Sequence, residues 1–192
     1  AFLSWESVRR IQEGLPDLRD IPACIGGDPT KRTGIVVAKS IPAKKCGVQT
    51  GEPVAMALWK CPNMVIVPSD FDLYVRCSRA FKKICASYTP VMESFSIDEV
   101  FLDMTGTSLL YPDPIAAAHE IKDRIYEELG FTVNIGISTN KLLAKMASDF
   151  EKPNKVHTLF PEEIPEKMWP LPVRELLFLG KASEKKLIEA GI

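Results

Sequence analysis

Two adjacent acids, Asp98 and Glu99, interrupt an otherwise apolar segment that reads SIDEVFLD from residue 96. Neighbouring side chains of a regular strand point to opposite faces, so an unbroken strand would send one carboxylate into the core. The two acids can act together only if the pleat breaks there, at a strand entry or a bulge. Carboxylates that are brought together repel, and a divalent cation such as Mg²⁺ removes that cost. The pair is therefore a candidate metal site, and the alternative is an edge strand whose acids are merely solvated.

Apolar periodicity and turn residues indicate an α+β fold, in which helices pack on one face of a sheet. Glycine and proline mark the boundaries, and residues 16–32 are expected to form loops. A proline-rich joint follows the last strand and leads to a final short helix. The predicted helices cover residues 4–15, 52–60, 70–86, 114–129 and 140–150, the last one capped by Ser138 or Thr139, and the predicted strands cover residues 34–38, 64–67, 96–105, 131–137 and 157–160.

Composition sets limits on partners and location. The net charge of −1 does not by itself predict a nucleic-acid partner, so a basic DNA-binding surface would have to be local. The five cysteines are scattered without a C-x-x-C pair, which indicates reduced thiols in a cytoplasmic protein and no zinc site. No apolar run reaches membrane-spanning length, so no membrane partner is expected.

Four motifs in order resemble one protein family. The segment SIDEVFLD is similar to the signature of Y-family (UmuC-type) lesion-bypass DNA polymerases. The same family's other motifs resemble AKKCGV at residues 43–48, GISTNKLLAK at residues 136–145 and KPN at residues 152–154. The resemblance covers essentially the whole chain and strongly disfavours the solvated-edge alternative.

The resemblance implies a polymerase palm, built on a mostly antiparallel sheet with helices on one face, beside small fingers and the start of a thumb. The expected boundaries are residues 1–69 for the fingers, with a remnant of the first palm segment, residues 70–160 for the palm and residues 161–192 for an incomplete helix-hairpin-helix thumb.

The resemblance also implies residue roles. Asp98 and Glu99 would hold two Mg²⁺ ions that activate the primer 3′-hydroxyl and neutralise the triphosphate. Lys44 and Lys152 would grip the triphosphate, although a solvated surface lysine is the alternative for Lys44. Asp103 would be structural because strand alternation turns it away from Asp98. Lys141 and Lys145 are spaced i, i+4 and so share one helix face, and this face is either functional or merely solvated.

Further positions follow from the same resemblance. Phe2 and Leu3 would lie at the nucleotide, with Leu3 where the family usually has an aromatic residue that excludes ribonucleotides. Ile41 stands where a tyrosine often touches the triphosphate. Ile35 and Val37 share one strand face and would cover the nascent base pair. The DNA backbone would be held by the start of the thumb, at Gly180, Lys181 and Ala182.

The implied function is translesion synthesis on primer-template DNA with deoxynucleoside triphosphates, with a sliding clamp or accessory subunit as a further partner through a C-terminal region. The family carries another metal-binding aspartate just before Phe2, so we expect the printed chain alone to be inactive. Two alternatives stay open: a non-catalytic module that binds DNA or a partner, and a different metal-dependent palm enzyme such as a nucleotide cyclase.

Overall fold

The structure is a computed structural model that describes residues 1–28 and 34–191. The predicted loop at residues 16–32 lies partly outside the described residues, at residues 29–32, and the predicted thumb does so at residue 192. The described α-helices are α1 (Phe2–Gln12), α2 (Ile41–Lys45), α3 (Val54–Lys60), α4 (Phe71–Ala86), α5 (Pro114–Leu129), α6 (Lys141–Asp149), α7 (Ile164–Lys167) and α8 (Lys181–Glu189). The described strands are β1 (Ala23–Gly26), β2 (Val36–Lys39), β3 (Val65–Val67), β4 (Met92–Ser94), β5 (Val100–Leu102), β6 (Ile135–Ile137) and β7 (Val156–Thr158).

The chain divides into two compact units. The first comprises Ala1–Ser87, Glu93–Val100 and Glu128–Phe131, and the second comprises Tyr88–Met92, Phe101–Glu127 and Thr132–Ile192. Each unit has its own buried core, and each is described by itself.

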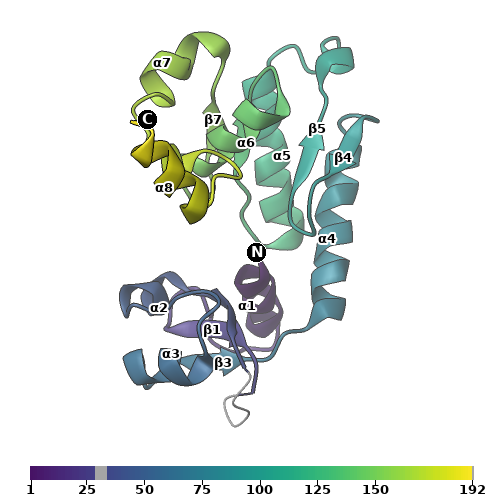
Figure 1. The fold of residues 1–192 in the computed structure, drawn as a ribbon. Helices are drawn as coiled ribbons and strands as arrows, with labels where there is room; N and C mark the ends of the chain where they lie inside the picture. The colour runs from purple at the N-terminus through teal and green to yellow at the C-terminus, as the bar shows by residue number, and fades with distance from the viewer. Residues whose placement is uncertain (29–33, 192) are drawn as a thin grey trace. The chain divides into compact units, whose positions relative to one another are not determined.

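A three-stranded sheet in the order β2-β1-β3 forms the centre of the first unit. The middle strand β1 runs antiparallel to β2, with Ile25 opposite Ala38, and parallel to β3, with Ile25 opposite Val67. Helices α2 and α3 lie beside this sheet (Figure 1). Their contact with it is a core of small apolar side chains: Cys24, Val36, Ala43, Val48, Val54, Ala57, Cys61 and Met64.

Helix α4 is the longest element of the first unit, and its sequence explains both its start and its buried face. The side chain of Asp70 caps its first turn by accepting a hydrogen bond of 2.9 Å from the amide of Leu73. Apolar and small side chains then recur at helical spacing and are buried: Leu73, Tyr74, Ser78, Phe81, Ile84 and Cys85.

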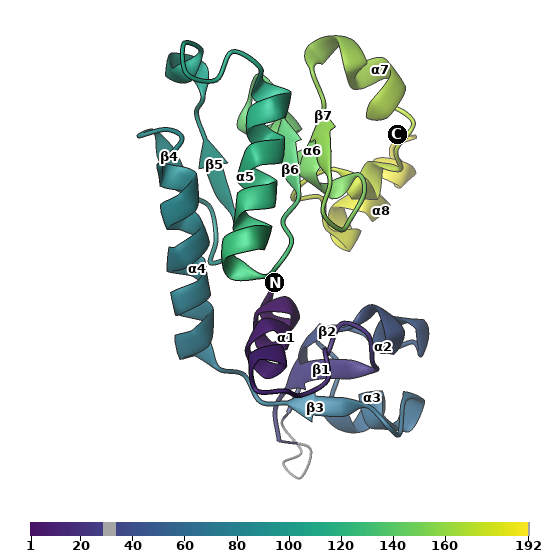
Figure 2. The same cartoon turned by 180° about the vertical axis from the view of Figure 1, so that it is seen from behind.

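The second unit is organised around α6 and a parallel pair of strands. Strands β6 and β7 pair with Gly136 opposite His157, and α6 lies against both (Figure 2). The side chain of Asn140 caps α6 by accepting a hydrogen bond from the amide of Leu143. The segment after β7 covers α6 with Ile164, Met168, Leu171, Leu176 and Leu177, which pack on Leu143, Met146, Ala147 and Leu159.

The predicted α+β class is confirmed, as are the helices predicted at residues 52–60, 70–86 and 114–129. The described strands pair in three small sheets, and the β6-β7 pair is parallel. Two local predictions were wrong. The cap of α6 is Asn140 rather than Ser138 or Thr139, because Asn140 has the extended backbone that directs its side chain to the free amides. The segment predicted as loop contains β1, a fully buried strand whose small residues Ala-Cys-Ile-Gly carry no alternating pattern.

Among the described residues, none of the helices is both long and apolar enough to cross a bilayer.

Candidate active site

The two adjacent acids lie in the turn of a hairpin between β4 and β5, just before β5 begins at Val100. The amides of Phe95 and Ser96 both donate to the carbonyl of Glu99, at 3.1 and 3.2 Å, and close the turn. The strand predicted from residue 96 therefore starts four residues later. This difference supplies the break in the pleat that Asp98 and Glu99 need in order to act together.

The carboxylates of Asp98 and Glu99 converge on one hydroxyl group. The Oγ of Ser96 lies 2.9 Å from Oδ1 of Asp98 and 3.1 Å from Oε2 of Glu99. Asp98 is exposed and Glu99 is half-buried, so a ligand from solvent can reach them. Converging carboxylate oxygens are hard donors of the kind that Mg²⁺ and Ca²⁺ prefer. Within the described ranges no cluster of three or more His, Cys, Asp or Glu side chains could hold a metal, so the described part offers a two-carboxylate set.

The turn that carries these acids is tied to α4. The Oγ of Ser78 donates to the carbonyl of Ile97, and the Nζ of Lys82 donates to the carbonyl of Ser96 at 2.7 Å. Ser78 lies on the buried face of α4, whereas Lys82 is half-buried. Neither residue was singled out from the sequence. Their i, i+4 spacing gives no hint of which carbonyls they reach.

The side chain of Asp103 makes its contact two residues further along the chain. Its carboxylate accepts a hydrogen bond of 2.9 Å from the amide of Thr105, and hydrogen bonds from Thr105 lower the pKa of the Asp103 carboxyl. Its own amide donates to the carbonyl of Val91 on the other side of the hairpin. The structural role of Asp103 stays a prediction.

Ile41 and Lys44 lie on α2, a short helix that the sequence analysis missed. The hydroxyl of Ser40 caps it by accepting from the amide of Ala43 at 3.1 Å, and the same hydroxyl donates to the carbonyl of Ile21. Both predicted ligands of the triphosphate are exposed, while Ala43 between them is fully buried. The Ser-x-Pro start, in which serine caps and proline occupies the first turn, is the signal that would have identified this helix.

The predicted cover of the nascent base pair has the alternation expected of a strand. Val36 is fully buried, whereas Ile35 before it is 51% exposed and Val37 after it is half-buried. Ile35 itself lies just before β2 and forms an isolated bridge with Pro53.

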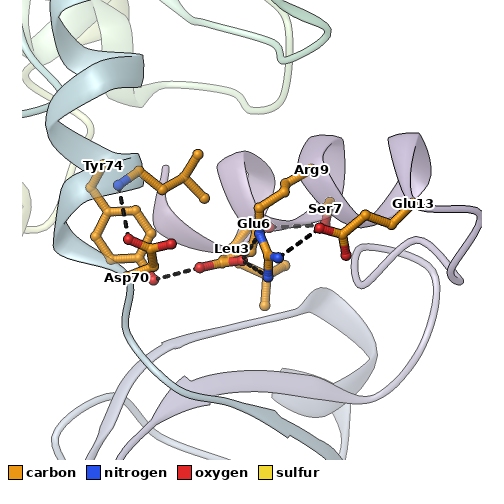
Figure 3. Close-up of polar contacts among 8 residues, drawn as sticks. Leu3, Glu6, Ser7, Arg9, Glu13, Asp70 and Tyr74 are labelled. Carbon is orange, nitrogen blue, oxygen red and sulfur yellow. Dashed lines mark hydrogen bonds and ion pairs between the residues drawn. The ribbon is translucent and has the colours of Figure 1, made fainter.

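Phe2 and Leu3 belong to the first turn of α1, beside an aromatic cluster. The ring of Phe2 stacks on that of Tyr74 with centroids 4.4 Å apart, and Leu3 is buried at 8% exposure. Glu6, one turn further on, was not expected from the sequence, and it has no exposed surface and contacts Arg9 and Tyr74 (Figure 3). Burial is the main reason that the pKa of Tyr74 is raised to about 12.

The second unit carries the lysines of the later motifs. Asp149 pairs through Oδ2 with Lys145 at 2.7 Å and through Oδ1 with Lys152 at 2.6 Å. Burial by itself would raise the pKa of Asp149, but hydrogen bonds from the two lysines outweigh it and leave that pKa lowered. The Nζ of Lys141 lies 5.8 Å from the ring centroid of Phe101. The predicted contacts to the DNA backbone lie at the start of α8, where Gly180 is the N-cap and Lys181 and Ala182 are exposed.

The cysteines have no disulfide partners. All five are free, and only Cys46 is classed as exposed. Burial raises the pKa of Cys24 and of Cys85 to about 11, which leaves these two thiols protonated and unreactive at neutral pH.

Two sequence profiles match the chain. Residues 1–149 match the impB/mucB/samB family, and residues 161–192 match the helix-hairpin-helix motif of the same family. The chain belongs to the impB/mucB/samB family. The Y-family resemblance drawn from the four motifs is thereby confirmed.

Relatives of this impB/mucB/samB chain carry polymerase names. It is 49% identical over 193 residues to a DNA polymerase IV of Clostridium acetobutylicum, with 100% of this chain and 48% of the relative covered. Among solved structures, a Y-family DNA polymerase chimera has a TM-score of 0.88 at 28% identity, covering 99% of this chain and 56% of its own. An insertion ternary complex of Dbh DNA polymerase has a TM-score of 0.87 at 29% identity, covering 100% and 55%. The chain thus spans about half the length of the curated relatives it matches.

Proposed function

We propose that this chain carries the metal-binding and nucleotide-binding parts of a DNA-directed DNA polymerase of the translesion type. The convergence of Asp98 and Glu99 on the hydroxyl of Ser96 is the observation that supports this most directly, since it brings two hard oxygen donors together at the surface. The names of the relatives, DNA polymerase IV and Y-family DNA polymerase, support the same reaction class. The substrates would be primer-template DNA and deoxynucleoside triphosphates.

In this proposal Asp98 and Glu99 would hold two Mg²⁺ ions. Such ions, when bound, lower the pKa of the attacking hydroxyl and neutralise charge on the transferred phosphoryl group. Lys44, exposed on α2, would donate to triphosphate oxygens as a compact positive charge. Lys152 would do the same after leaving Asp149, its partner in the described structure.

The remaining residues would bind and orient. Phe2 and Leu3 on α1 would lie at the nucleotide sugar, and Ile41 would contact the triphosphate without a hydrogen bond. Ile35 and Val37 would cover the new base pair. The start of α8 at Gly180, Lys181 and Ala182 would contact the DNA backbone through amides at a helix N-terminus. The boundaries at residues 69 and 160, a clamp or accessory partner and a cytoplasmic location stay predictions.

Primer extension with Mg²⁺ tests the proposal. The printed chain and the same chain at the full length of its relatives would be assayed in parallel, each with Asp98→Asn and Glu99→Gln variants. Asp72→Asn, an exposed acid on α4, is the matched control. At the full length of the relatives, we expect each site variant to reduce extension by roughly 10²-fold or more, with the control unchanged, whereas the 192-residue chain is expected to give no extension.

The same assay separates the alternatives. If Asp98→Asn extends primers as well as the unsubstituted protein, the metal assignment is wrong. Product formation without a primer would favour a nucleotide cyclase. DNA binding without extension at either length would favour a non-catalytic binding module.

A further inference from the structure

Two side chains of α4 hold the turn that contains the acid pair. Ser78 and Lys82 are one helical turn apart, and they donate to the carbonyls of Ile97 and Ser96, which are consecutive residues directly before Asp98. Two donors on one helix thus fix two successive peptide groups of the turn. This arrangement fixes the position and the orientation of the two peptide groups that precede Asp98.

The helix that supplies these donors is a rigid support. Its start is capped by Asp70, and its inner face is buried at Tyr74 and Phe81. Ser78 has 6% of its surface exposed, so its hydroxyl needs a partner inside the protein. A lysine that is only half-buried could direct its ammonium group to water, yet Nζ of Lys82 lies 2.7 Å from the carbonyl of Ser96.

Ser96, which Lys82 holds in place, is also the residue whose hydroxyl lies near both carboxylates. The carbonyl of Ser96 accepts from Lys82, while its hydroxyl lies within hydrogen-bond distance of Asp98 and Glu99. Adjacent carboxylates repel each other, and a loose turn would let them separate. Removal of a group that orients a metal ligand without touching the metal commonly lowers metal affinity by roughly 10- to 100-fold.

We infer that Ser78 and Lys82 are positioning residues that hold Asp98 and Glu99 in the geometry needed to bind a divalent cation. The inference rests on the proposed function, in which Asp98 and Glu99 bind metal. It adds the two residues that hold these carboxylates in position before metal binds. Lys82 acts through the Ser96 carbonyl, and Ser78 acts through the Ile97 carbonyl. Loss of either donor should loosen the same short turn.

Two direct measurements test this without relying on catalysis. Mn²⁺ binding to the 192-residue chain would be followed by electron paramagnetic resonance, and hydrogen exchange of residues 95–100 would be followed by mass spectrometry in the absence of metal. The variants are Lys82→Met, Lys82→Arg and Ser78→Ala. Lys83→Met is the matched control, because Lys83 is the adjacent, exposed lysine of the same helix.

We expect Lys82→Met and Ser78→Ala each to weaken Mn²⁺ binding by roughly tenfold and to speed exchange of the turn. Lys82→Arg, which keeps a donor for the Ser96 carbonyl, should restore binding to within about twofold of the unsubstituted chain. Ser78→Ala keeps the net charge, so agreement between it and Lys82→Met separates positioning from a charge effect. Since Ser78 is buried, its substitution could also change the stability of the fold, so thermal unfolding of each variant is measured alongside. Lys82 is only half-buried, so Lys82→Met is the variant whose folding should be disturbed least.

Normal exchange and normal Mn²⁺ affinity in both Lys82→Met and Ser78→Ala would overturn the inference. A different result bears on the proposed function. If the chain binds no Mn²⁺, or if Asp98→Asn binds it as well as the unsubstituted chain, the metal pair itself is rejected, and the inference is rejected with it.

Discussion

The Oη of Tyr74 donates a hydrogen bond of 3.3 Å to Oε1 of Glu6, a carboxylate with no exposed surface, and so joins α4 to α1 (Figure 3). The other oxygen, Oε2, accepts from Nε and Nη2 of Arg9 at 3.0 and 2.8 Å. Both carboxylate oxygens therefore have partners, which is what makes a buried acid tolerable in the core.

Glu6→Ala should destabilise the first unit strongly, because it removes the acceptor that two residues, Tyr74 and Arg9, share. We expect a loss of about 3 kcal/mol in the free energy of unfolding, measured by urea titration. Glu13→Ala is the matched control. Glu13 also pairs with Arg9, but at the surface, so its removal should cost less than about 0.5 kcal/mol. Equal losses in the two variants would contradict the importance of the buried contacts.

Gly136→Ala should disrupt the packing of β6 on α6. A Cβ atom at Gly136 would overlap the carbonyl oxygen of Ala144 and lie 2.5 Å from the amide nitrogen of Ser148, and both are backbone atoms that cannot rotate away. We expect a loss of more than about 3 kcal/mol, or failure to fold. Thermal unfolding measures it, with Gly106→Ala as the control, since a Cβ there meets nothing within 4 Å. A Gly136→Ala variant as stable as the control would show that α6 can move.

Glu163 should make stability depend on pH in the acid range. A hydrogen bond from Lys167 is the main cause that lowers the pKa of Glu163 from 4.5 to about 2, helped by one from the amide of Phe160. A lowered carboxyl pKa stabilises the fold above the unfolded value, and this contribution is lost as the pH falls from about 4.5 towards 2.

Glu163→Gln should therefore lower the free energy of unfolding at pH 7 by about 1 kcal/mol, a modest value because the partners are partly solvated. The difference from the unsubstituted chain should shrink as the pH is lowered through that window. Glu162→Gln, at an exposed neighbouring acid, should show no such trend. A pH-independent difference for Glu163→Gln would argue against ionisation as its source.

Lys44→Ala should weaken nucleotide binding if the proposed function holds. Loss of a charged donor to a phosphate oxygen should raise the KM for the deoxynucleoside triphosphate roughly tenfold in primer extension, with a smaller effect on kcat. Lys45→Ala, the exposed neighbour on α2, is the control. Equal effects of the two substitutions would indicate a general loss of positive charge instead of a specific contact.

Local rules identified much of the fold. The cap at Asp70, the apolar stripe of α4 and the stop at Gly130, whose φ is +76°, are all encoded within a few residues of where they act. Strand β1 was missed because it is buried on both faces, and its small side chains leave no period for a pattern to detect. Helix α2, only five residues long, is held to β1 and the residues before it by the hydroxyl of Ser40, which accepts from the amide of Ala23 and donates to the carbonyl of Ile21.

The sequence by itself determined the family, through four short motifs in fixed order, and it marked Asp98 and Glu99 as acids in an unusual place. Only the tertiary structure decided how these acids meet. Their convergence depends on a turn closed by the Glu99 carbonyl and held from α4 by Ser78 and Lys82, which lie 19 and 14 positions from the carbonyls that they bind. Glu6 follows the same logic, since its burial is tolerable only because Tyr74 arrives from a helix 68 residues later. Hydrogen bonds between distant segments depend on where the packed elements place their donors, and spacing along the chain carries no record of that placement.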